Sequence, residues 1–153
     1  MIDQKLQELC DLEEIRALKH RYAYLANIVD GVPGDPKEFA SLFTETATLD
    51  LGMGLCTGRD EIESMMKAAT TQWKAAMHYM LNPLVRVNGD TAEGTITGLF
   101  AFTTETNPSP IWLSNIYTDT FARTSEGWKF QSVRIKSTFA DPAFFEAYAD
   151  LLK

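Results

Sequence analysis

The chain has 153 residues, of which 45% are hydrophobic and 23% charged, a composition typical of a globular domain with a sizeable core. Its formal net charge is −7, with 21 acidic residues against 14 basic ones. Because nucleic acids and anionic membranes bind clustered Lys and Arg, this balance argues against either as a partner. We expect one domain over residues 1–153.

Several special chemistries are not expected from the residues present. Cys10 and Cys56 form no CxxC motif and are predicted to be buried free thiols. Two distant histidines and scattered acids give no metal-ligand spacing, and no phosphate-binding glycine loop occurs, so we expect no metal and no cofactor. The N-terminus does not resemble a signal peptide and no apolar run approaches ~20 residues, which favours a cytoplasmic location.

The first half of the chain is predicted to be mainly helical. A first helix is expected to end near Asp30-Gly31, and a short second helix to start at Asp35-Pro36 and bury Phe39, Leu42 and Phe43. A short strand over 47–51 and a third helix over 59–73 follow. The first helix carries an apolar stripe at spacings of three and four, namely Leu6, Leu9, Leu12, Ile15, Leu18, Tyr22, Leu25 and Val29.

The second half has the alternation of long strands, which we predict over 77–87, 91–105, 111–123 and 128–139. Asn88-Gly89 is typical of a two-residue hairpin turn, and Pro83 or Gly98 is expected to bend the sheet. A terminal helix is predicted over 142–152. Helices followed by antiparallel strands predict an α+β fold, with a curved sheet wrapped around a long helix to leave a cone-shaped cavity.

Two histidines are available for chemistry. His20 lies off the apolar stripe and is predicted to be solvated. His78 lies early in an apolar strand, where it is either a core histidine bonded to a backbone carbonyl or a general base, since imidazole suits proton transfer near neutral pH.

Further candidates lie on the first helix. Tyr24, Asn27 and Asp30 share one face at spacings of three, whereas Tyr22 belongs to the apolar stripe and is expected to point inward.

The other candidates lie in strands. Asp50 ends a short apolar strand, at a cavity or its rim. Arg134 is expected by alternation to share a face with Phe130 and Ser132. Trp112 is a candidate apolar wall for a ligand.

Six segments together resemble the SnoaL-like branch of the nuclear transport factor 2-like superfamily, over almost the whole chain. They are IRALKHRY (15–22), FASLFTETA (39–47), GRDEI (58–62), MHYMLNP (77–83), NGDTA (88–92) and GWKF (127–130). Within that superfamily the chain is most similar to the branch of bile-acid 7α-dehydratase, scytalone dehydratase and hexachlorocyclohexane dehydrochlorinase. The motifs are specific for the fold and weakly specific for a reaction.

The resemblance implies roles for particular residues. His78 matches the strand histidine that these enzymes use as a base, while Tyr22 and Arg134 match a helix tyrosine and a late-strand arginine. The branch pairs its histidine with an aspartate, and the ungapped match here is Asn27, unless a longer loop brings Asp30 into that place. Asparagine can orient an imidazole ring but cannot neutralise its cation.

These observations favour a cofactor-independent lyase or isomerase acting on a small apolar cyclic or aromatic molecule. Candidate reactions are the elimination of water, hydrogen halide or formaldehyde. A noncatalytic ligand carrier or a dimerisation module of the same fold stays open, as does a carboxylate base at Asp50. The resemblance also implies a homo-oligomer, either a trimer or a dimer.

Overall fold

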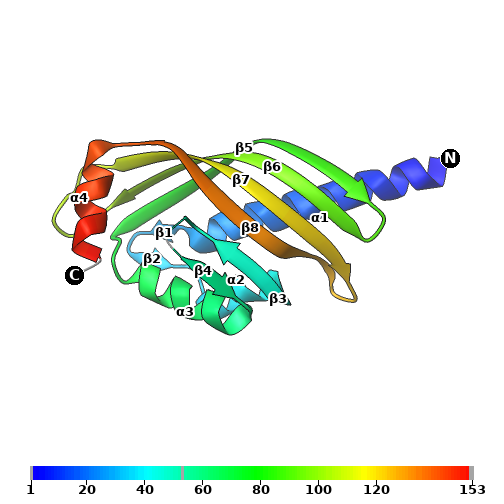
Figure 1. Ribbon diagram of the computed structural model, residues 1–153, viewed down its shortest axis with the longest axis horizontal. Coiled ribbons are helices and arrows are strands. Elements are labelled where there is room, and N and C mark those ends of the chain that lie inside the picture. Colours follow the sequence, from blue (N-terminus) through cyan, green and yellow to red (C-terminus); the bar gives the residue numbers. More distant parts are fainter. Residues whose placement is uncertain (1, 53, 152–153) are drawn as a thin grey trace.

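The computed structural model describes residues 2–52 and 54–151, which form one strongly curled sheet with helices on its concave side (Figure 1). The helices of this part of the chain are α1 (Ile2–Ala26), α2 (Pro36–Ser41), α3 (Arg59–Thr70) and α4 (Pro142–Leu151). The strands are β1 (Ile28–Val29), β2 (Val32–Pro33), β3 (Phe43–Asp50), β4 (Leu55–Thr57), β5 (Ala75–Asn88), β6 (Thr91–Thr103), β7 (Ile111–Thr124) and β8 (Gly127–Ala140).

The strand order in the sheet is β2-β1-β5-β6-β7-β8-β3-β4. β3 runs parallel to β8, and every other neighbouring pair is antiparallel. The predicted α+β class with a mixed, mostly antiparallel sheet is therefore confirmed. The four long strands begin and end within two residues of their predicted bounds, because alternation and the Asn88-Gly89 turn define them locally.

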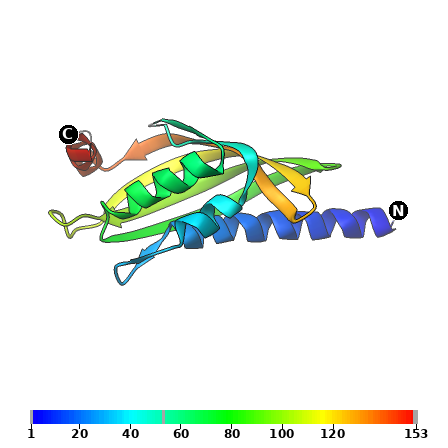
Figure 2. The same ribbon diagram turned by 90° about the horizontal axis from the view of Figure 1, so that it is seen from below.

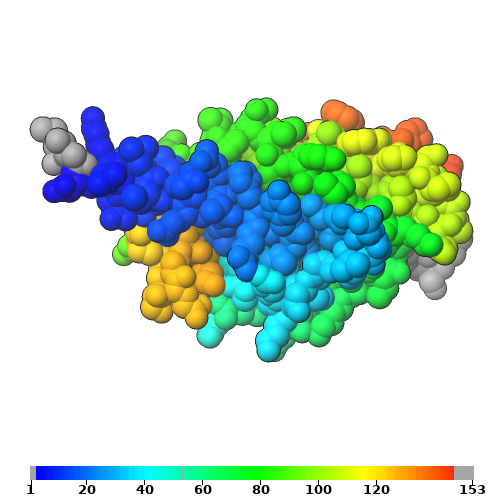
Figure 3. All heavy atoms as spheres, turned by 180° about the vertical axis from the view of Figure 1, so that it is seen from behind, coloured from blue at the N-terminus to red at the C-terminus, as the bar shows by residue number. Residues whose placement is uncertain are grey.

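Helix α1 packs along the sheet from about Asp11 onward, and its first turns project beyond the sheet. Figure 2 shows α3 lying across the concave face beside α1, and Figure 3 shows the N-terminal end of α1 extending past the rest of the molecule. Ile15 and Leu18 are buried as predicted, whereas Leu6 and Leu9 are exposed. The predicted stripe is thus wrong at its N-terminal end, because the first turns have no sheet beneath them.

The end of α1 differs from the prediction. The helix stops at Ala26, and Ile28–Val29 pairs with Val32–Pro33 in a small hairpin. Asp30 and Gly31 form its turn with φ of 53° and 76°, the left-handed conformation that Asp-Gly supplies in two-residue hairpins. Ile28 also pairs with Ala76, which joins this hairpin to the start of β5.

Bends in the long strands give the sheet its curl. The pairing of β5 with β6 shifts between Leu81 and Leu84, where Asn82 has a φ of 50°, so the bend expected at Pro83 is confirmed. Gly98 lies in regular pairing instead. A Cβ atom at this position would lie 2.3 Å from Cε2 of Tyr117, so the glycine makes room for that ring.

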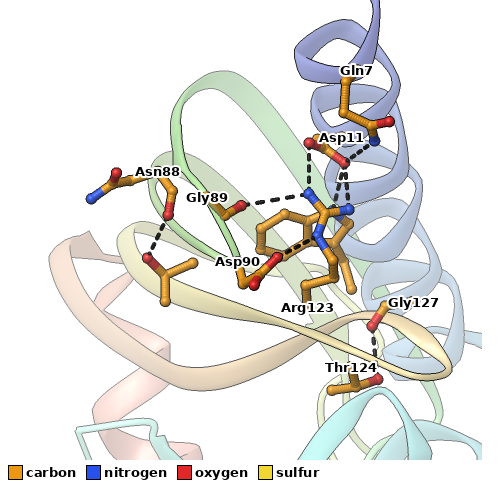
Figure 4. A network of polar contacts seen from close by, with 10 residues as sticks. Gln7, Asp11, Asn88, Gly89, Asp90, Arg123, Thr124 and Gly127 are labelled. Atoms are coloured by element: carbon orange, nitrogen blue, oxygen red, sulfur yellow. Dashed lines mark hydrogen bonds and ion pairs between the residues drawn. The ribbon is translucent and has the colours of Figure 1, made fainter. Parts of the chain in front are cut away.

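The first half of α1 is attached to the sheet by a polar network (Figure 4). Nη1 and Nη2 of Arg123 donate to the two carboxylate oxygens of Asp11, each at 2.8 Å, and its Nε donates to Asp90 at 2.9 Å. Nε1 of Trp128 and Nε2 of Gln7 also donate to Asp11. The hydrogen bond from Arg123 is the main reason that the pKa of Asp11 is lowered to about 2.

Cys10 and Cys56 are both free, but neither is buried as predicted: Cys10 is exposed and Cys56 is only partly buried. In residues 2–52 and 54–151, no helix combines the length and apolar character needed to cross a membrane. The same residues contain no group of three or more His, Cys, Asp or Glu side chains placed to hold a metal ion.

Candidate active site in the cavity between helix α1 and the sheet

A cavity of about 530 Å³ lies at the junction of two hydrophobic clusters. One cluster packs α1, α2 and α3 against the sheet, and the other surrounds Phe100 and Phe102 near α4. This volume is in the range of small-molecule sites. The wall is mostly apolar; its polar and charged side chains are Tyr22, Thr70, His78, Asn115, Tyr117, Lys136 and Ser137.

His78 reaches the cavity from β5, and Asn27 orients it. Oδ1 of Asn27 accepts a hydrogen bond from the backbone N–H of His78 at 2.7 Å and lies 3.2 Å from its Nδ1. The pairing of Ile28 with Ala76 places the end of α1 beside His78 and makes both contacts possible. Asn27 contacts the edge of the imidazole, and one face of the ring stacks on Phe100, with ring centroids 4.3 Å apart.

These contacts define the tautomer of the imidazole. Because an amide oxygen only accepts, Nδ1 of His78 must carry the proton that it shares with Asn27. Nε2 then holds the free lone pair. Burial, and after it the charge of Lys19, lowers the pKa of His78 to about 3, so the ring is neutral at physiological pH.

Two tyrosines supply hydroxyl groups to the same wall. Tyr22 of α1 and Tyr117 of β7 both line the cavity, and their rings meet edge to face with centroids 6.1 Å apart. Burial, and next the neighbouring Tyr117, raises the pKa of Tyr22. Burial followed by the Asp119 charge raises the pKa of Tyr117. Both hydroxyls therefore stay protonated at neutral pH. The hydroxyl of Tyr22 donates to that of Tyr117, which keeps its own hydrogen to donate.

Asn115 and Ser137 add a further polar element to the wall. Oγ of Ser137 donates to Oδ1 of Asn115 at 3.0 Å, and the amide of Asn115 is buried. Neither residue was predicted from the sequence. The alternation of β7 was the available signal, because Asn115 shares a face with Leu113 and Tyr117, and all three line the cavity.

Of the eight site residues named from the sequence, the structure brings together His78, Asn27 and Tyr22 and places the other five elsewhere. Asp30 lies in the exposed β1–β2 turn, and Tyr24 is exposed on α1. Trp112 lies on β7 beside Leu113, which lines the cavity, so alternation points Trp112 to the outer face of the sheet.

Arg134 and Asp50 contact each other on the outer face. Nε of Arg134 lies 3.7 Å from Oδ2 of Asp50, and the arginine side chain is 76% exposed. The expected alternation is interrupted, because the pairing of β7 with β8 shifts between Thr120 and Phe121. Phe130 is consequently buried, although it was expected on the same face as Arg134.

A buried ion pair lies behind the tyrosines and was also missed from the sequence. Nζ of Lys19 lies 2.7 Å from Oδ2 of Asp119, and the two side chains are 5% and 0% exposed. The ammonium lies 3.8 Å from the ring centroid of Tyr117 and 4.5 Å from that of Tyr22. Burial lowers the pKa of Lys19 and raises that of Asp119, and their mutual attraction opposes both shifts.

Solved structures with the same fold include proteins of several descriptions. A nuclear transport factor 2-like protein from Novosphingobium aromaticivorans is 25% identical, covers 99% of this chain and 95% of its own, and has a TM-score of 0.76. A provisionally assigned scytalone dehydratase from N. aromaticivorans DSM 12444 is 22% identical over 92% of this chain and 91% of its own, with a TM-score of 0.76. The hexachlorocyclohexane dehydrochlorinase LinA-type3 of Novosphingobium barchaimii LL02 is 20% identical over 90% of this chain and 93% of its own, also with a TM-score of 0.76.

These similarities confirm the expected nuclear transport factor 2-like fold. No curated protein matches the chain. The family model of the SnoaL-like domain matches residues 7–134, which include most of α1, all of α2 and α3, three of the four long strands and most of β8. The chain belongs to the family of SnoaL-like domains.

Proposed function

We propose that the protein is a cofactor-independent lyase or isomerase that acts on a small apolar cyclic or aromatic molecule. The observation that carries the proposal is a neutral imidazole in a mostly apolar cavity, with Nδ1 of His78 committed to Asn27 and Nε2 left as a base. The folds of a dehydratase-like protein and of dehydrochlorinases are similar to that of this chain, and such eliminations begin with proton abstraction.

The chemistry assigned to His78 is the removal of an acidic proton. Nε2 takes the proton from carbon or from a phenol, and the electron pair left behind moves toward a carbonyl oxygen or a departing group. The hydroxyl of Tyr117, or that of Tyr22 when it turns away from Tyr117, donates to that oxygen or group as negative charge develops on it. Elimination of water, hydrogen halide or formaldehyde, or migration of a double bond, all fit this arrangement.

The amide partner of His78 narrows the substrate class. Asn27 fixes the ring but brings no negative charge to stabilise an imidazolium. A base with a pKa of about 3 is weak, so the proton it removes must be activated by the substrate itself. Protons next to a ring carbonyl and protons of phenols meet this requirement, whereas unactivated C–H groups do not.

Exchange of substrate protons for deuterium tests the proposed base without requiring the leaving group to be known. The protein is incubated in D₂O with a panel of cyclic ketones such as 1-tetralone, and loss of the α-proton signal is followed by NMR. We expect catalysed exchange that His78→Gln lowers by about 10²-fold or more and that His20→Gln leaves intact. Equal exchange by His78→Gln and the wild type would refute the base.

A noncatalytic ligand carrier is the second candidate, and the amide at position 27 is the observation that favours it. A carrier binds members of the same panel without exchanging their protons. Binding is measured in parallel by fluorescence titration, so that binding without exchange in the wild type selects the carrier.

We also propose that the chain assembles as a homo-oligomer, a trimer or a dimer, through the outer face of the sheet. Phe139 is opposite Ser114 in the β7–β8 pairing, and Trp112 is two residues from Ser114 on the same face. Their exposed fractions are 69% and 42%, which leaves two large apolar side chains side by side in water.

A further inference from the structure

The buried pair Lys19–Asp119 touches the cavity only through other residues. Neither residue is part of the cavity wall, but the Lys19 ammonium lies against the rings of Tyr22 and Tyr117, which are. Its distance to Oδ2 of Asp119 is 2.7 Å, while Oδ1 of the same carboxylate has no hydrogen-bond partner among the described residues. The ion pair with Lys19 therefore does not replace all the hydrogen bonds that the Asp119 carboxylate loses on leaving water.

Fold stability is a poor explanation for such a pair. Removing two charges from water costs several kcal/mol each, and the attraction between them offsets this only when the remaining polar atoms are also hydrogen-bonded. Asp119 does not meet that condition. Two apolar residues of similar volume would fill the space at least as well, so a role in the neighbouring site is the better explanation.

The position of the pair lets each charge act on a different group. The Lys19 ammonium opposes protonation of His78, because two positive charges in a buried region repel each other. The Asp119 carboxylate opposes ionisation of Tyr22 and Tyr117 for the corresponding reason. The ammonium also attracts the faces of the two tyrosine rings and restrains their orientation.

We propose that Lys19 and Asp119 form a positioning pair that holds the rings of Tyr22 and Tyr117 at the cavity wall and, together with burial, helps to keep His78 as an acceptor. This inference rests on the proposed function and assigns its ligand class. A neutral phenol or cyclic alcohol accepts from a tyrosine and donates to His78. A cyclic ketone accepts from a tyrosine but donates nothing to His78, so it is expected to bind less tightly than a phenol. A carboxylate also brings a negative charge toward the lone pair of Nε2, and the attraction of Lys136 for it is screened by water because that wall residue is exposed.

The first test compares three ligands of one shape on the wild-type protein: 2-naphthol, 2-naphthoate and naphthalene. Fluorescence titration is expected to show that 2-naphthol binds more tightly than either of the others, by roughly 3–10-fold for each hydrogen bond gained. Equal or tighter binding of 2-naphthoate would overturn the inference. This comparison needs no variant and no turnover.

The second test removes both charges with Lys19→Met/Asp119→Asn, since removing one alone leaves a buried unpaired charge. The matched control is Asp11→Asn/Arg123→Met, which removes the other buried-carboxylate pair; Asp11 lies eight residues, or roughly 12 Å, from Lys19 along α1. Thermal unfolding establishes that both variants are folded. The readouts are the 2-naphthol preference and the titration of His78 followed by ¹⁵N NMR, with His20 as internal reference.

In the Lys19/Asp119 variant we expect the preference for 2-naphthol over 2-naphthoate to fall by roughly 3–10-fold and the titration midpoint of His78 to rise toward its free value of ~6.5. The control is expected to change neither. A folded variant with unchanged preference and unchanged His78 titration shows that the pair is only structural. Proton exchange by the wild-type protein tests the proposed reaction separately. A failure of the proposed function is therefore distinguished from a failure of the proposed positioning pair.

Discussion

One oxygen atom of Asn27 accepts hydrogen bonds from both the backbone N–H and Nδ1 of His78, at 2.7 and 3.2 Å. The two residues are 51 positions apart in the chain, and the contact joins the end of α1 to the start of β5 at the cavity wall. The amide of Asn27 sets the orientation and tautomer of the ring. Because the amide is uncharged, it does not stabilise the protonated form of His78.

Asn27→Asp is expected to raise the pKa of His78 by one unit or more from its value of about 3, because a carboxylate within hydrogen-bond distance stabilises the imidazolium. The titration is followed by ¹⁵N NMR, where exposed His20 serves as the reference. The same variant should move the acidic limb of any proton-exchange activity to higher pH. An unchanged midpoint for His78 would mean that Asn27 does not contact the ring in solution.

Stability should depend on pH through His78. Its folded pKa of about 3 lies below the ordinary histidine value of ~6.5, so as the pH falls the unfolded chain binds this proton first. The stabilisation is complete above ~6.5 and is lost progressively as the pH falls toward 3. His78→Gln should flatten the pH dependence of the free energy of unfolding by up to about 1.4 kcal/mol per pH unit.

Comparing urea unfolding of the wild type and His78→Gln between about pH 7 and pH 5 isolates this effect. Asp119, whose pKa is raised, is present in both proteins, and Asp11, with a pKa of about 2, contributes only at more acid pH. His20→Gln is the matched control, because it removes the exposed histidine of α1 and leaves the contacts of His78 unchanged. A slope equally steep in His78→Gln would assign the pH dependence to other groups.

The long strands and the approximate positions of the helices were predictable because periodicity and turn chemistry are local. The short strand expected over 47–51 begins earlier, at Phe43, and β4 was not predicted. The β1–β2 hairpin was not predicted either, although its turn is one of the commonest sequence signals. Asp30-Gly31 suits both a helix end and a hairpin turn, since glycine with positive φ serves in each. The pairing of Ile28 with Ala76, a contact between distant segments, decides between them.

The candidate site was predictable where a residue's face followed from spacing. Lys19 lies four residues after Ile15 and three before Tyr22, so its spacing places it on the buried stripe of the helix. It was not predicted there because a lysine is ordinarily expected at the surface. Asp119 alternates with Tyr117 and Phe121 in the same way along β7. For Arg134, the irregular pairing at Thr120 and Phe121 broke the expected alternation, and a single sequence carries no signal for such a shift.

Gly98→Ala is expected to destabilise the protein by about 1–3 kcal/mol, because the added Cβ would lie 2.3 Å from Cε2 of Tyr117 and displace that ring. Chemical denaturation measures the change, and ligand titration should show weaker binding as the cavity wall moves. Gly94→Ala is the graded control, since its Cβ would lie 3.1 Å from a ring atom of Phe121. Equal stability of wild type and Gly98→Ala would show that Tyr117 packs differently in solution.

The double substitution Trp112→Ser/Phe139→Ser should weaken self-association by roughly tenfold or more, because both apolar side chains lie side by side on the outer face of the sheet and large aromatic residues dominate protein interfaces. Sedimentation velocity over a range of concentrations gives the oligomer mass and its dissociation constant. Leu84→Ser is the matched control, since Leu84 is more exposed than either residue but lies at the bend of β5, away from this pair. A wild-type protein that stays monomeric throughout, or a double variant with unchanged association, would place the proposed interface elsewhere or remove it.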